Sequence, residues 1–128
     1  MTALSFRVRT AATLLRWIPA NLRGKKRLAR LLFGKGMNER DVEIISSRGD
    51  RFRMPSVREP VAFDMLIDGQ YEPDVLAFIQ SHVPPGGTFV DVGANVGAFT
   101  IPIARHLGPQ GCVLAIEASP VKIGRAHV

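Results

Sequence analysis

The chain has 128 residues, a formal net charge of +6 and 46% hydrophobic residues, a composition typical of one globular domain. Its single cysteine, Cys112, excludes an intramolecular disulfide and a cysteine-based metal cluster. No apolar run approaches the roughly 20 residues that span a bilayer. Arg7, Arg9, Arg16 and Pro19 interrupt the first apolar stretch, so no secretory signal is predicted.

The positive charge is concentrated at the N-terminus. Residues 1–36 contain nine Lys/Arg and no Asp/Glu, whereas the remaining residues contain eight Lys/Arg and eleven Asp/Glu. Two helices are predicted over 3–18 and 22–33, and the second carries Leu28, Leu31 and Leu32 at helical spacing. We expect a basic-faced helix pair that packs on the domain, with a membrane-surface helix as the alternative. No nucleic-acid reader motif is present, so nucleic acid is not an expected partner.

Residues 37–70 predict a β-hairpin and a connector. The strands are expected over 42–46 and from residue 51, with a turn at 48–50, while 61–67 fits either a short helix or a strand. A helix is then predicted over 71–83, because Pro73 lies at its start. Its expected apolar stripe consists of Val75, Leu76, Ile79 and Val83. The acids expected to be solvated are Asp64, Asp68, Glu72 and Asp74.

Residues 71–121 predict an α/β arrangement. A buried strand over 88–92 is followed by a helix over 98–107 and by a second apolar strand that runs from Cys112 to Glu117. This order predicts a βαβ unit with a helix ahead of it. Cys112 is expected to be a buried, inert thiol.

The turn after the first of these strands contains the candidate site. Asp91, Gly93, Asn95 and Gly97 lie within seven residues, and glycine suits a sharp passage from strand to helix. The dinucleotide pattern G-x-G-x-x-G is absent, and a carboxylate at the turn suits a ligand with an ammonium group rather than a pyrophosphate. Glu117 ends the next strand, where an acid accepts hydrogen bonds from ribose hydroxyls. A ligand with an amino acid end and a nucleoside end, such as S-adenosylmethionine, matches both features.

The segment FVDVGANVGAFTIPIARHLGPQGCVLAIEASP resembles the first two motifs of class I S-adenosylmethionine-dependent methyltransferases, and DVGANVG is most similar to the FkbM family. The resemblance covers about residues 58–120. It implies a Rossmann-like fold, of which this chain holds the first βαβ unit, and transfer of a methyl group to an oxygen of a small-molecule, glycan or lipid-linked acceptor. The residues that it implies for cofactor binding are Asp91, Gly93, Asn95, Gly97, Glu117 and Ala118, with Tyr71 and Glu72 facing the pocket.

Two other functions stay open at this point. One is a nicotinamide- or flavin-binding Rossmann fragment, and the other is a non-catalytic membrane-surface or interaction module that acts through residues 1–36. The three histidines show no metal-ligand spacing, so no metal site is predicted. A cytoplasmic location is expected, with peripheral membrane contact through residues 1–36 as the open alternative.

The last residues, 122–128, are similar to the translation of a sequencing-library adapter, and we expect them to be a non-native tail. The sequence therefore predicts four parts, which are 1–36, 37–70, 71–121 and 122–128. We expect the chain to be the N-terminal part of a methyltransferase and to be inactive alone in a radiolabelled-methyl transfer assay.

Overall fold

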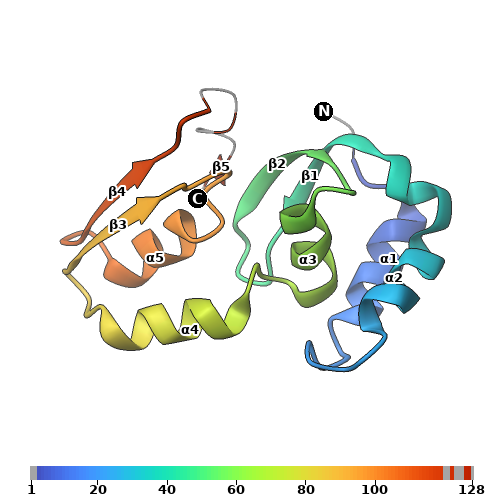
Figure 1. Ribbon diagram of the computed structural model, residues 1–128, viewed down its shortest axis with the longest axis horizontal. Helices are drawn as coiled ribbons and strands as arrows, with labels where there is room; N and C mark the ends of the chain where they lie inside the picture. The colour runs from blue at the N-terminus through green and yellow to red at the C-terminus, as the bar shows by residue number, and fades with distance from the viewer. Residues whose placement is uncertain (1–2, 120–121, 123–125, 128) are drawn as a thin grey trace.

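The protein is a mixed α/β structure with two small sheets, as the computed structural model shows for residues 3–119, 122 and 126–127. The basic helices lie at one end of the molecule, and the glycine turn lies near its middle, on the side of the hairpin (Figure 1). In chain order the elements are α1 (Phe6–Leu15), α2 (Lys25–Phe33), the 3-10 helix η1 (Gly34–Asn38), β1 (Arg40–Ile45), β2 (Arg51–Ser56), α3 (Pro60–Asp68), α4 (Pro73–His82), β3 (Thr88–Val92), α5 (Thr100–Leu107), β4 (Cys112–Ile116) and β5 (Ala126–His127).

The two sheets differ in direction. The first has the order β1-β2-β5 and is antiparallel, and it contains the predicted hairpin. The second consists of β3 and β4, which pair in parallel from Thr88 opposite Cys112 to Val92 opposite Ile116. Since α5 connects these two parallel strands, β3, α5 and β4 form the predicted βαβ unit. The α/β class is therefore confirmed.

Most of the core lies under the first sheet. One cluster joins α1, α2, the hairpin and α3, with Phe33, Ile44 and Phe52 at most 1% exposed. Val96 and Ala98, from the glycine turn, belong to the same cluster. A smaller cluster of Leu76, Ile103 and Leu107 joins α4 to α5 behind β3 and β4. The glycine turn thus packs on the hairpin side of the molecule.

The N-terminal helices are shorter than predicted, and α2 packs through a different face. Gly24 has a φ of +88° and precedes α2, so the helix begins at Lys25 and not at Leu22. The buried side of α2 is Lys25, Ala29 and Phe33. The helix pair packs on the domain as expected, but the leucines at helical spacing do not take part, since Leu28, Leu31 and Leu32 are 41%, 69% and 38% exposed.

Residues 61–67, for which the sequence allowed either a helix or a strand, belong to helix α3. Pro60 occupies its first turn, where the missing N–H costs little, and Gly69 ends it with a φ of +79°. Helix α4 begins at Pro73, as predicted, and buries Leu76, but Val75 of the predicted stripe is 43% exposed. Two boundaries near the turn also move, because α5 begins at Thr100 rather than Ala98 and β4 ends at Ile116 rather than Glu117.

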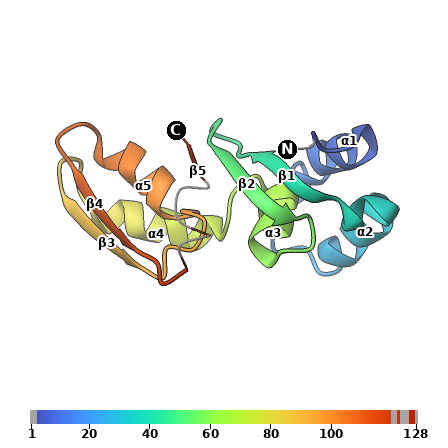
Figure 2. The ribbon, with the colours of Figure 1, turned by 90° about the horizontal axis from the view of Figure 1, so that it is seen from above.

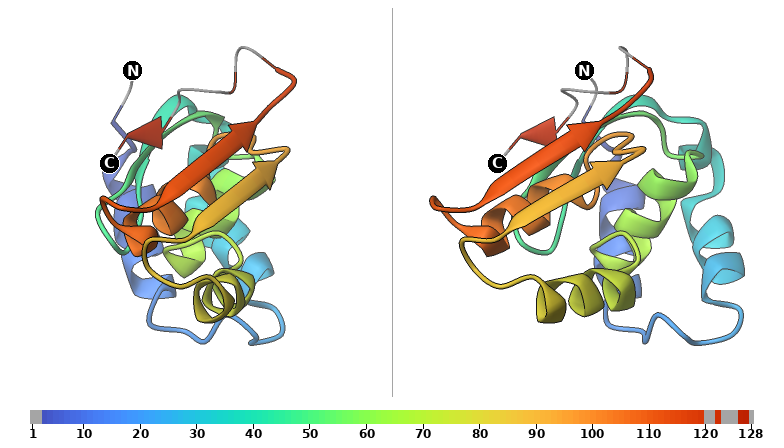
Figure 3. Two further views of the ribbon diagram at one scale, coloured as in Figure 1. Left: turned by 90° about the vertical axis from the view of Figure 1, so that its left-hand side faces the viewer. Right: turned by 60° about the vertical axis from the view of Figure 1, so that its left-hand side comes forward.

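One face of the parallel pair is apolar and open. Helices α4 and α5 lie behind β3 and β4, whose other face is towards the viewer in Figure 3. Side chains alternate along a strand, so one face carries Phe89, Asp91 and Val113, which are buried or half-buried. The opposite face carries the exposed side chains Val90, Val92, Cys112, Leu114 and Ile116. The prediction of a buried Cys112 is wrong, because this thiol lies on the open face.

The exposed position of Cys112 predicts a reactive thiol in the native protein. Cys112 in the native protein is expected to react with a water-soluble disulfide reagent about as fast as it does in urea, because its side chain is exposed. The measurement is the absorbance of released thiolate with time in both solvents. Cys112→Ala removes the signal and is the control. Protection of the native thiol by tenfold or more relative to urea would contradict the exposed position.

No helix in the described ranges is long and apolar enough to cross a membrane. Of the predicted tail 122–128, residues 123–125 and 128 lie outside the described residues, as do 120–121 at the end of the part before it. Within the tail, Ala126 and His127 pair with Phe52 and Arg51 at the edge of β2.

Candidate functional site

The turn between β3 and α5 adopts the backbone geometry that its glycines allow. Gly93 and Gly97 both have a φ of +82°, and Asn95 between them has a φ of +52°. Asparagine tolerates this left-handed region better than most residues with a side chain. The residue types at all three positions therefore fit the conformation of the turn.

Backbone hydrogen bonds hold the turn against the end of β4. The N–H groups of Gly93 and Ala94 both donate to the carbonyl oxygen of Ile116, at 2.8 and 3.0 Å. The Gly97 N–H donates to Ala94 at 2.7 Å and closes the turn on itself. These contacts bring residues 93–95 beside the residue that follows β4, which is Glu117.

Glu117 accepts a hydrogen bond at each carboxylate oxygen. The backbone N–H of Asn95 donates to Oε2 and that of Ser119 donates to Oε1, both at 2.8 Å. The structure therefore brings Asn95 and Glu117 together, as the sequence predicts for a shared site. A carboxylate offers about four lone-pair positions, so each oxygen keeps room for one more donor.

These two N–H groups also stabilise the ionised form of Glu117. They lower the pKa of Glu117, with Ser119 as the larger cause and Asn95 as the second. The half-exposed carboxylate is therefore ionised at neutral pH. Because the folded pKa is lowered, its contribution to stability is present above the ordinary glutamate pKa and is lost as the pH falls through the lowered value.

Asp91 lies beneath the turn rather than at its surface. Its side chain is 9% exposed, and Oδ2 accepts a hydrogen bond from the hydroxyl of Thr100, the first residue of α5. This bond ties the end of β3 to the start of α5. Asp91 thus fixes the shape of the turn.

The remaining predicted residues surround this centre. A Cβ on Gly93 would meet no atom within 4 Å, so the turn is open on that side. Ala118 is exposed beside Glu117. The Tyr71 ring contacts the ring of Phe99 edge-on, with 5.5 Å between the two centroids. Burial, and after it the charge of Glu72, raises the pKa of Tyr71. Glu72 is exposed with a φ of +41°.

Two side chains that position the site were missed by the sequence analysis. Thr100 is one, and its signal is a hydroxyl residue three positions after Gly97 at the start of a helix. Arg105 of α5 is the other, since its guanidinium pairs with Asp50, a 2% exposed carboxylate in the hairpin turn. Asp50 lies 55 residues earlier in the chain, so no local pattern indicates this pair.

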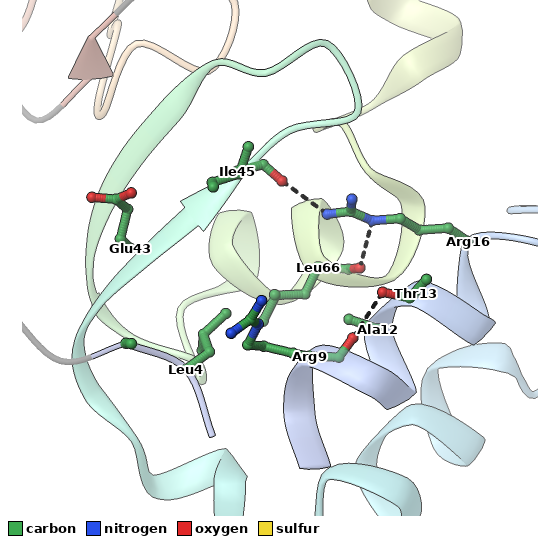
Figure 4. A pocket seen from close by; sticks show the side chains of 9 residues that line it. Leu4, Arg9, Ala12, Thr13, Arg16, Glu43, Ile45 and Leu66 are labelled. Atoms are coloured by element: carbon green, nitrogen blue, oxygen red, sulfur yellow. Dashed lines mark hydrogen bonds between the residues drawn. The ribbon is translucent and has the colours of Figure 1, made fainter. Parts of the chain in front are cut away.

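Two cavities lie away from the turn between β3 and α5. One of about 450 Å³ lies between α2 and the start of α3, and Lys26, Arg30 and Arg58 contribute to its lining. The other, of about 330 Å³, lies between α1 and β1 (Figure 4). There Arg16 donates to the carbonyl oxygens of Ile45 and Leu66 at 3.0 and 3.2 Å, and burial lowers its pKa. Arg16 is thus a structural bridge from α1 to β1 and α3.

Comparison with known proteins adds no further information on the site. No protein-family model, no curated protein and no solved structure matches the chain. Its function is therefore inferred from the geometry of the turn and the residues around it.

Proposed function

We propose that the β3–α5–β4 unit is the cofactor-binding part of an S-adenosylmethionine-dependent methyltransferase of the FkbM type, which directs the methyl group to an oxygen. The observation that carries the proposal is the pairing of Glu117 with the Asn95 N–H, which places an ionised carboxylate beside a glycine turn. The ends of parallel strands are where α/β proteins bind nucleoside ligands.

The residues present fit this cofactor. Gly93 leaves open space where the backbone of the turn would approach the methionine and ribose portion. Glu117 has acceptor positions left for the two ribose hydroxyls. Ala118, a small exposed residue beside it, leaves room for the adenine. Bound in this way, the cofactor supplies an electrophilic methyl group, and the chain's own residues hold and orient it.

The polarity of the turn supports this cofactor over a dinucleotide. A pyrophosphate needs free N–H groups at the glycine turn. Here the N–H groups of Gly93 and Ala94 are bonded to Ile116, and that of Asn95 is bonded to Glu117. Asp91 adds a second carboxylate under the same turn. Two carboxylates favour the ammonium group and hydroxyls of S-adenosylmethionine over a phosphate anion.

Calorimetric titration with S-adenosylhomocysteine tests the proposal on the full chain. We expect saturable binding of S-adenosylhomocysteine and none of NAD at the same concentrations. Tighter binding of NAD would replace the proposal with a dinucleotide-binding function. Failure to bind either ligand, by a chain with a cooperative thermal transition, would overturn both.

A further inference from the structure

The N-terminal helices expose an unusual number of large apolar side chains. Trp17 and Phe6 are 86% and 83% exposed, and Leu31 and Leu14 are 69% and 62% exposed. Leu22, Leu28 and Leu32 add further exposed apolar surface. All seven lie on α1, α2 and their connection, at the end of the molecule away from β3 and β4 (Figure 2).

Helix α1 carries apolar residues on its exposed side as well as on its buried side. Its buried positions are Val8, Ala11, Ala12 and Leu15, which share one side of the helix. Phe6, Leu14 and Trp17 fall on the opposite side at helical spacing. Arg7 connects this helix to α2, because its guanidinium donates to the carbonyl oxygen of Leu32 at 2.7 Å. This bond and the packing of α1 on α2 hold the two helices side by side at one end of the molecule.

Basic side chains outnumber acidic ones around these apolar residues. Residues 1–36 carry nine Lys/Arg and no Asp/Glu. Lys26 is paired with Asp64, but Arg9, Arg23 and Arg27 form no ion pair with any described residue. Exposed Trp, Phe and Leu together with Lys and Arg are the composition of helices that lie in a membrane interface.

From these observations we infer that α1, α2 and their connection form a docking surface for an anionic lipid bilayer. The apolar side chains Phe6, Leu14, Trp17 and Leu31 enter the headgroup region, and Arg23 and Arg27 bind lipid phosphates and carboxylates. The positive charge of this surface favours an anionic bilayer over a second copy of the chain. A second copy would bring a second Arg23 and Arg27 against the first pair, whereas anionic lipid neutralises them. The inference is independent of the proposed methyltransferase function.

Trp17 is the only tryptophan in the chain, so its fluorescence reports on this surface alone. We expect a blue shift when the full-length protein meets vesicles of phosphatidylcholine mixed with phosphatidylserine, and little change with phosphatidylcholine alone. Added salt should weaken the binding, because it screens the basic residues. Cosedimentation with the same vesicles gives the partition coefficient.

Matched variants locate the contact. Phe6→Ser should lower the partition coefficient about tenfold, since one large apolar side chain no longer enters the interface. Phe78→Ser removes an equally apolar side chain, 64% exposed on α4, and should leave it unchanged. Arg23→Glu combined with Arg27→Glu should lower it about tenfold on anionic vesicles. Circular dichroism checks that each variant folds.

Three results would overturn the inference. The first is absence of binding to phosphatidylserine vesicles by the folded protein. The second is an equal loss of binding in Phe78→Ser and Phe6→Ser, which would move the contact away from α1. The third is a blue shift that grows with protein concentration in the absence of lipid, because a second copy would then cover Trp17.

Discussion

Replacing Glu117 with alanine is expected to lower the affinity for S-adenosylhomocysteine about 100-fold, because the ligand loses two hydrogen bonds to a charged acceptor. The carboxylate lies where the turn and the end of β4 meet, with one further acceptor position at each oxygen. Titration calorimetry of Glu117→Ala against the unaltered chain measures the change. Glu117→Gln, which keeps the length but not the charge, should fall between the two.

The control for this prediction is Glu43→Ala. Glu43 is also half-buried but lies on β1, where it pairs with Arg51. Its replacement should leave the affinity unchanged. Equal affinity of Glu117→Ala and the unaltered chain would show that the ribose hydroxyls do not bind Glu117. Thermal unfolding of each variant separates a loss of binding from a loss of the turn, since Glu117 also accepts from Asn95 and Ser119.

Replacing Lys25 with methionine is expected to lower the free energy of unfolding by about 3 kcal/mol, because it leaves a buried carboxylate without its partner. The Lys25 side chain is 3% exposed and that of Asp68 is 12% exposed, and Nζ lies 2.5 Å from Oδ1. Nζ also donates to the carbonyl oxygen of Ile18 at 2.7 Å. Lys25 thus joins the start of α2, the end of the α1 segment and the end of α3.

The neighbouring residue supplies a matched control. Lys26 pairs with Asp64 at 2.8 Å, but its side chain is 58% exposed, so Lys26→Met should cost less than about 1 kcal/mol. Urea unfolding of both variants measures the difference. Adding Asp68→Leu to Lys25→Met should recover part of the loss, because the unpaired charge is removed. Equal costs for Lys25→Met and Lys26→Met would contradict the account of a buried pair.

The sequence predicted the elements wherever one local signal decided them. Pro73 indicated the start of α4, the short apolar runs indicated β3 and β4, and the glycines indicated the turn between β3 and α5. The meeting of Asn95 and Glu117 was also predictable, since parallel strands end at the same edge of a sheet. The predicted ends of the elements were less accurate. Helix α5, for example, begins at Thr100 and not at Ala98.

Which face of an element is buried could not be read locally. Helix α2 carries two apolar stripes, one with Ala29 and Phe33 and one with Leu28 and Leu32, and only its packing on α1 and on Phe63 of α3 decides between them. Cys112 is exposed because α4 and α5 both lie on the other side of β4. Asp68, expected in solvent, is paired with Lys25 from 43 residues away. Each error comes from a contact distant in sequence.

The position of Val96 and Ala98 in the main core has a consequence for how the molecule opens. These two residues of the turn are buried in the same cluster as Ile44 and Phe52 of the hairpin. The turn therefore cannot unfold alone without exposing apolar surface of β1 and β2, and the two regions form one cooperative unit. A molecule bound at Glu117 consequently slows amide hydrogen exchange in strands that it does not touch, in proportion to its occupancy.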